Sequence, residues 1–167
     1  MAPRLLRACL AALALLAGAC APHQYLDTFL TADGYQLTFV RPSTLRCDRA
    51  TLTIDFTHNA APGADVACNF TLVSDNVLPG AVQRLAFRLG AADTVAVHAL
   101  KVLTVDESSA RFTSKLDVPS FTRLVRCASA DSCPCTALLG TAAETLALTP
   151  SSDFHAAMKA AGRVIMR

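Results

Sequence analysis

This chain of 167 residues contains little charge: 17% of its residues are charged, and its formal net charge is +2. Arg4 and Arg7, close to the start, account for this excess, so the rest of the chain is neutral. Nucleic acids and anionic membrane surfaces attract proteins through clusters of basic side chains. The charge balance therefore indicates that nucleic acid is not a partner and that charge does not attach the folded part to a membrane.

Catalytic motifs are missing as well. The sequence has no G-x-S-x-G nucleophile elbow, no glycine-rich phosphate-binding loop and no H-E-x-x-H zinc motif. Its four histidines are scattered singly, which differs from the clustered spacing of a metal site. These absences favour a non-enzymatic protein with no catalytic residue, no metal and no cofactor.

Long apolar runs are confined to the start of the chain. Hydrophobic residues make up 53% of the sequence, too many for a disordered tail. After residue 20, however, no segment is long and apolar enough to cross a bilayer. The length fits one ordinary domain.

The first residues have the pattern of a secretory signal. A short basic segment, Met1 to Arg7, precedes the wholly apolar run Leu10 to Leu16, and small residues follow at positions 17–21. This order is typical of an export signal and too short for a permanent transmembrane helix. The sequence therefore predicts export from the cytosol.

The end of this signal resembles the lipobox of bacterial lipoproteins. The resemblance covers about twenty residues and ends in Ala17-Gly18-Ala19-Cys20. It implies that residues 1–19 are removed as a signal peptide and that Cys20 is acylated, so that residues 20–23 anchor the protein to a lipid bilayer. Ala21, where some Gram-negative families place Asp, implies the outer membrane. A second possibility remains open, because cleavage after Ala19-Cys20-Ala21 would discard Cys20 and release a soluble protein.

Beyond the signal, alternation of apolar and polar residues predicts a hairpin of two strands. Residues 24–32 and 35–40 flank Asp33-Gly34, a dipeptide that favours a two-residue type I′ turn. Such a turn would pair Leu30 with Leu37 and place both on one face with Leu26 and Phe39.

Further segments alternate in the same way, and turn residues such as Pro42 separate them. They are residues 51–57, 66–72, 84–89, 111–118, 121–127 and 145–149, with a central strand, apolar on both faces, over 94–105. We therefore predict a mainly β fold, an antiparallel β-sandwich or a barrel, as one domain over residues 24–167. One helix is expected at the C-terminus, over 152–166, from a Ser cap and apolar residues at helical spacing.

Cysteines offer the remaining chemical signal. In an exported protein, Cys47, Cys68, Cys127, Cys133 and Cys135 are disulfide candidates. Cys127 follows Cys68 by 59 positions, a separation that resembles the inter-sheet bridge of immunoglobulin-like domains. The chain lacks the tryptophan that accompanies that bridge, so the resemblance is architectural. Alternatives are Cys47 with Cys68, or Cys127 with Cys133 or Cys135.

Three functional hypotheses follow. The first is a membrane-anchored lipoprotein of the bacterial cell envelope that acts as a non-enzymatic binding or assembly module for an unidentified envelope protein, through loops or an exposed strand edge. The second is a thiol-dependent redox or metal-binding protein built on Cys127, Cys133 and Cys135. The third is a soluble binding protein, secreted or viral, stapled by disulfides and glycosylated at the sequon that begins at Asn69.

Overall fold

A computed structural model describes residues 25–74 and 82–166 of the chain. The signal peptide (1–19), the anchored segment (20–23) and Cys20 lie outside the described residues. The strands are β1 (Leu26–Leu30), β2 (Gln36–Cys47), β3 (Ala50–Asn59), β4 (Val66–Ser74), β5 (Val82–Leu89), β6 (Asp93–Ala96), β7 (His98–Val105), β8 (Ser109–Leu116), β9 (Cys135–Thr141) and β10 (Thr145–Pro150). The helices are α2 (Val118–Ala128) and α3 (Ser152–Ile165).

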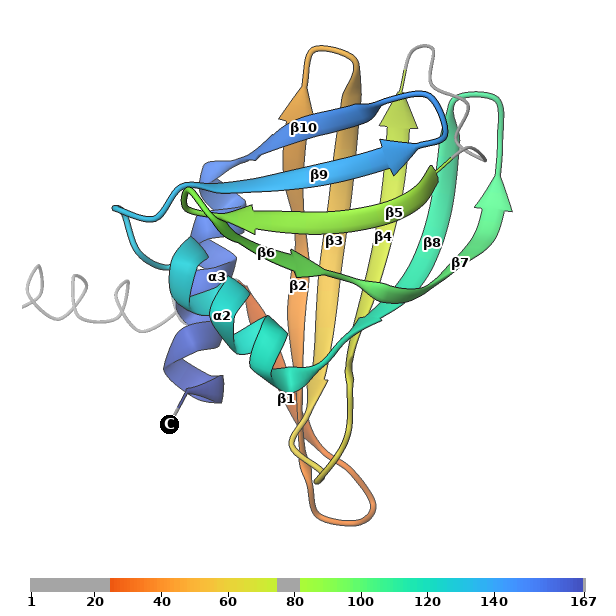
Figure 1. Cartoon of the computed structure of the whole chain (residues 1–167). Helices are drawn as coiled ribbons and strands as arrows, with labels where there is room; N and C mark the ends of the chain where they lie inside the picture. Colours follow the sequence, from red (N-terminus) through yellow and green to blue (C-terminus); the bar gives the residue numbers. More distant parts are fainter. Residues whose placement is uncertain (1–24, 75–81, 167) are drawn as a thin grey trace, which may run out of the picture.

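The strands form one antiparallel sheet that curls into a nearly closed barrel (Figure 1). The strand order is β6-β5-β9-β10-β2-β3-β4-β8-β7, and β1 pairs with β2 beside this path. The two ends of the path, β6 and β7, are consecutive in sequence and are separated only by Val97. The prediction of a mainly β, antiparallel fold is confirmed, in its barrel form.

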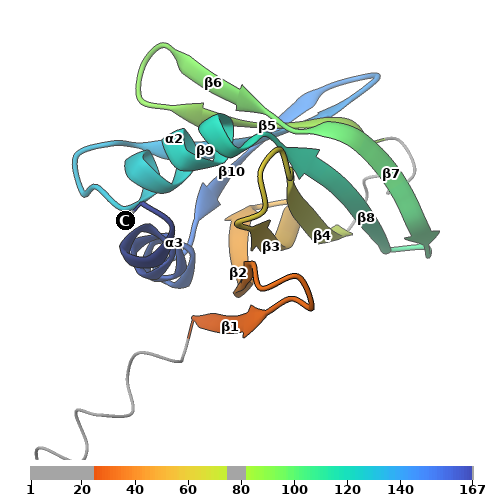
Figure 2. The ribbon, with the colours of Figure 1, turned by 90° about the horizontal axis from the view of Figure 1, so that it is seen from below.

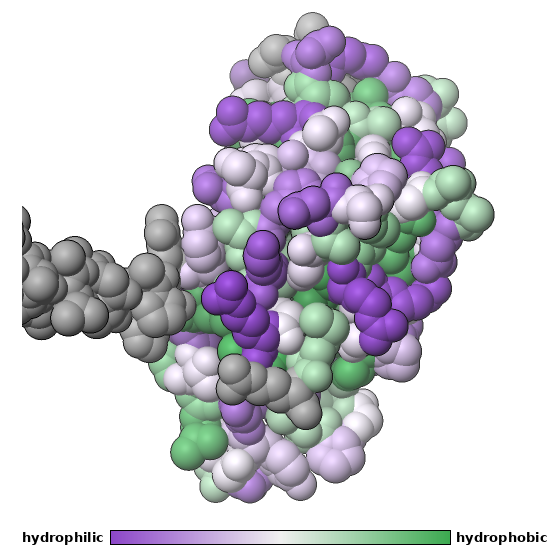
Figure 3. Space-filling view, turned by 90° about the vertical axis from the view of Figure 1, so that its left-hand side faces the viewer, coloured by the Kyte–Doolittle hydropathy of each residue, from purple (hydrophilic) through white to green (hydrophobic). Residues whose placement is uncertain are grey.

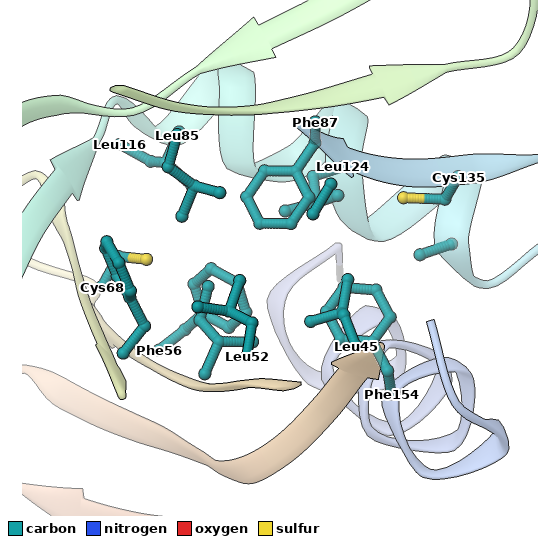
Figure 4. Close-up of a cluster of buried hydrophobic side chains, with 14 of the residues drawn as sticks. Leu45, Leu52, Phe56, Cys68, Leu85, Phe87, Leu116, Leu124, Cys135 and Phe154 are labelled. Atoms are coloured by element: carbon teal, nitrogen blue, oxygen red, sulfur yellow. The ribbon is translucent and has the colours of Figure 1, made fainter. Parts of the chain in front are cut away.

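The core fills the interior of this barrel. Side chains alternate along β3, where Leu52, Ile54 and Phe56 are buried and the polar residues between them, Thr53 and Asp55, face outward. Phe87 on β5 and Phe154 on α3 are buried with them, and the labelled side chains of Figure 4 converge from opposite walls. The Phe56 and Phe87 ring centroids lie 6.4 Å apart, so residues from distant strands meet in the interior.

Residues 121–127, which the sequence pattern predicts as a strand, lie in helix α2, so this prediction is wrong. The Asp117 carboxylate accepts a hydrogen bond from the backbone N–H of Ser120 at 2.7 Å and caps the helix. This hydrogen bond lowers the pKa of Asp117. Pro119 lies in the first turn, where the missing N–H costs nothing. The cap and proline start a helix whose buried residues follow helical spacing: Phe121, Leu124, Val125 and Ala128.

Helix α3 is the C-terminal helix that the sequence predicts over 152–166. The Ser151 side chain accepts from the backbone N–H of Phe154 and caps it, and Phe154, Ala157, Met158 and Ala161 are buried along one face. The two helices lie side by side and pack on the sheet, with β7 on the opposite side of the molecule (Figure 2).

The β1–β2 hairpin forms in the predicted place but with a different register. Leu30 pairs with Gln36 and Phe29 pairs with Leu37, one residue away from the predicted pairing of Leu30 with Leu37. The backbone N–H of Gly34 bonds to the Thr31 carbonyl, and Gly34 has a φ of 81°. This is a type I turn followed by a left-handed glycine, and it adds one residue to the loop. A one-residue change exchanges the faces of one strand relative to the other, so Thr38 and Val40 are buried on the face of Leu26, where Leu37 and Phe39 were expected.

Two further strand predictions need correction. Residues 94–105 do not form one central strand: they form β6 and β7 at the edges of the sheet, and β7 is largely exposed. Pro42 does not separate two strands, because β2 continues through it with an irregularity in its pairing to β3 between Val40 and Ser43. Strand β9 was not predicted, although it pairs with both β5 and β10.

Candidate functional site

The cysteine cluster after α2 contains one disulfide. Cys127, in the last turn of α2, bonds to Cys133, and their Cα atoms lie 5.1 Å apart. The carbonyl of the next residue, Pro134, accepts from the backbone N–H of Gly90 at 2.8 Å. The bridge therefore fixes the end of α2 close to the start of β9, as one of the local staples considered from the sequence.

The other described cysteines are free: Cys47, Cys68 and Cys135. The alternative pairings of Cys68 with Cys127 or with Cys47 do not occur. The thiols of Cys68 and Cys135 point into the hydrophobic cluster (Figure 4). Burial raises the pKa of Cys68 to about 12 and that of Cys135 to about 11.

These pKa values bear on the redox hypothesis. The nucleophile in thiol–disulfide exchange is the thiolate, which a buried thiol of raised pKa does not form near neutral pH. Cys135 follows the bridge by two residues but is buried and protonated. The geometry therefore favours a structural staple over an exchanging pair.

Within residues 25–74 and 82–166, no three His, Cys, Asp or Glu side chains are grouped closely enough to hold a metal ion. Two of the histidines have structural contacts. The His58 ring stacks on Phe121 with centroids 6.5 Å apart, and the Nδ1 atom of His155 lies 2.9 Å from the carbonyl oxygen of Ala128. The His58 ring therefore connects β3 to α2, and the His155 ring connects α3 to α2.

Strand β7 is the most accessible part of the described sheet. It pairs with β8 on one side and ends the strand order, so among the described residues no strand covers its other edge. Val102, Leu103 and Val105 on this strand are exposed, as part of a largely exposed strand. An edge of this kind offers free backbone N–H and C=O groups beside apolar side chains.

Two irregularities mark this edge. The pairing with β8 shifts between His98 and Lys101 and again between Val102 and Thr104, and Ala99 has a positive φ of 53°. Bulges of this kind bend an edge strand and limit uncontrolled pairing with other copies of the chain. These irregularities therefore restrict which extended segments can pair with the β7 edge.

A groove of about 430 Å³ lies beside this edge, on the outer face of the sheet. Leu103 lines it together with Asp55, Asn69 and Arg111 from three neighbouring strands. The Asp55 carboxylate accepts from the Asn69 amide at 2.9 Å. Burial raises the pKa of Asp55, while the bond from Asn69 and the positive charge of Arg111 act in the opposite direction. The groove therefore combines one apolar wall with a carboxylate, an amide and a guanidinium.

Sequence reasoning did not find this groove, although it contains the predicted glycosylation residue. The outward register of Asp55 and Asn69 was visible in the alternation, but the pairing of β3 with β4 that aligns them was not. The Asn69 amide nitrogen, to which a glycan would be attached, is engaged by Asp55. This contact competes with glycosylation.

Neither described helix has the length and apolar character that a membrane crossing requires. No known family model, curated protein or solved structure matches this chain. The functional argument therefore depends on the geometry of the chain itself.

Proposed function

We propose that this protein is a lipid-anchored component of the bacterial cell envelope that binds a protein partner through the β7 edge and has no catalytic activity. The anchor is Cys20, in a segment that resembles a lipobox. The observation that carries the binding function is the exposed β7 edge, with Val102, Leu103 and Val105 at its surface.

Strand addition is the binding mode that this edge supports best. An extended segment of the partner would hydrogen-bond to the free backbone of β7 and extend the sheet. The groove beside Leu103 would take a side chain of the added strand, and Asp55 with Arg111 would select a polar or charged one. Backbone pairing then supplies affinity, and the groove supplies specificity.

Site-specific photo-crosslinking in the native envelope tests this binding function. A photoreactive residue replaces Val102, and in a control it replaces Val73, because both valines are 48% exposed. Val73 lies on β4, which is paired on both sides by β3 and β8. We expect a discrete cross-linked band at position 102 and a much weaker one at 73, and we expect Leu103→Lys to reduce the first. Equal labelling at both positions would contradict the proposal.

The intact mass of the mature protein tests the anchor separately. We expect an N-terminus at Cys20 carrying a diacylglyceryl group. A mature N-terminus at Pro22 with no acyl mass would replace the anchored form by a soluble secreted one.

A further inference from the structure

The tip of the β1–β2 hairpin exposes large apolar side chains. Phe29 is 56% exposed, Leu30 is 77% exposed, and Tyr35 is exposed across the turn. The hairpin extends beyond the rest of the barrel (Figure 1), and hydrophobic surface is visible at this end of the molecule (Figure 3). Burial of such side chains from water is favourable, so their exposure points to contact with an apolar surface.

These side chains project from both faces of the hairpin. Phe29 and Leu30 are successive strand residues, so they point in opposite directions. A protein surface that docks on a sheet covers one face of it. A surrounding apolar medium covers both, which favours a bilayer over a protein partner for this tip.

The charges near the tip agree with this choice. Between Thr28 and Val40 the only charged residue is Asp33, in the turn, and Arg41 is paired with Asp27 at 2.8 Å. The neighbouring loop, residues 60–64, contains Ala, Pro and Gly only and lies at the same end of the molecule (Figure 1). This end can therefore enter the bilayer interface without desolvating a cluster of charges.

The position of the anchor allows this contact. Tyr25 follows Cys20 by five positions, and a fully extended chain of that length spans at most ~18 Å. Strand β1, from Leu26 to Leu30, rises ~13 Å along its length. The chain that follows the acylated cysteine is therefore long enough for the hairpin tip to reach the bilayer that holds the lipid.

We infer that the β1–β2 hairpin tip inserts into the bilayer interface through Phe29, Leu30 and Tyr35 and orients the anchored domain. Tyrosine suits this position, since its ring is apolar and its hydroxyl remains in the polar region. The inference rests on the proposed anchor for bringing the tip to the membrane. It adds a second, protein-mediated contact that fixes the orientation of the barrel.

The absence of tryptophan provides a direct test. Phe29→Trp places a single tryptophan at the tip, and Leu103→Trp places one on β7 as a matched control, because Phe29 and Leu103 are both 56% exposed. Each full-length mature lipoprotein is reconstituted into phosphatidylcholine vesicles with plain or brominated acyl chains. We expect brominated lipid to quench tryptophan emission at position 29 at least twofold more than at 103, and high salt to leave this difference unchanged.

Flotation of the same vesicles separates failure of the anchor from failure of the hairpin. If the protein floats but quenching is equal at positions 29 and 103, the inference about the hairpin is wrong and the proposed anchor is still supported. If the protein does not float, the proposed anchor is wrong. Residues 21–167 are then attached to the vesicles by an N-terminal histidine tag on a nickel-chelating lipid. The same quenching ratio tests whether the hairpin tip enters the bilayer. A change in tryptophan emission at position 29 that appears only after envelope proteins are added would assign the tip to a protein partner. That result would also overturn the inference.

Discussion

The rings of Phe56 and Phe121 lie with their centroids 5.1 Å apart, and both side chains are fully buried. Phe56 belongs to β3 in the barrel wall and Phe121 to α2, so this pair joins the helix to the core. The His58 ring, two residues along β3, stacks on the same phenylalanine. Phe121 is thus the centre of the contact between the helix and the strand.

Truncation of Phe121 should destabilise the protein strongly. Removal of a buried phenylalanine side chain leaves a cavity, so Phe121→Ala should lower the free energy of unfolding by about 3–5 kcal/mol. Urea denaturation followed by circular dichroism measures this loss. Arg123→Ala, on the same helix, removes an exposed ion pair with Asp93 and should cost under about 1 kcal/mol. Similar losses for the two variants would contradict the proposed packing.

Stability should depend on the protonation of His58. Burial lowers the pKa of His58 below the usual 6.5, so folding favours the neutral ring. The contribution of neutral His58 to the free energy of unfolding is fully present above pH 6.5, where the ring is also neutral in the unfolded state. It is lost as the pH falls through the pKa of His58 in the folded state. His58→Phe should remove this part of the pH dependence. The comparison is the free energy of unfolding of the two proteins between pH 7.5 and 4.5, and parallel curves would reject the assignment.

Reduction of the Cys127–Cys133 disulfide should weaken the fold modestly. The bridge closes a short loop with a sequence separation of 6, so chain entropy gives ~2 kcal/mol for its contribution. The denaturation midpoint should fall in the presence of reductant. A variant with serine at both positions should show the same lower midpoint with and without reductant. A reductant effect that persists in that variant would place the labile bridge elsewhere.

The free thiols should differ in reactivity. Cys68 and Cys135 are buried with pKa values of about 12 and about 11, whereas Cys47 is half-buried at the end of β2. An aromatic disulfide reagent at pH 7.5 should label Cys47 first in the native protein and should reach the other two only in denaturant. Mass mapping of the labelled peptides identifies the order. Fast native labelling of Cys135 would revive the redox hypothesis.

The sequence predicted the fold class because outward polar and inward apolar residues alternate clearly in strands such as β3 and β4. It failed at α2 because 121–127 is short and apolar enough to fit either period, and Asp117 was assigned to the preceding strand and not recognised as a helix cap. Strand β9 was missed because Leu138, Leu139 and Gly140 break the alternation.

The candidate site was only partly predictable. An exposed strand edge was expected, but apolar residues on both faces of 94–105 suggested a central strand, and only the complete pairing shows that β7 is at the edge. The groove of Asp55, Asn69 and Arg111 depends on registers between strands that are distant in the sequence. Local pattern carries no information about such alignment.

The turn at Gly34 decides which residues of β2 lie opposite β1. If Asp33 and Gly34 alone formed the loop, Ala32 would pair with Tyr35 and Phe29 would pair with Thr38, which is buried on the barrel side. The same strand residues joined by a two-residue turn would therefore direct Phe29 toward the barrel. The left-handed glycine thus determines which side chains the hairpin presents to the proposed membrane contact.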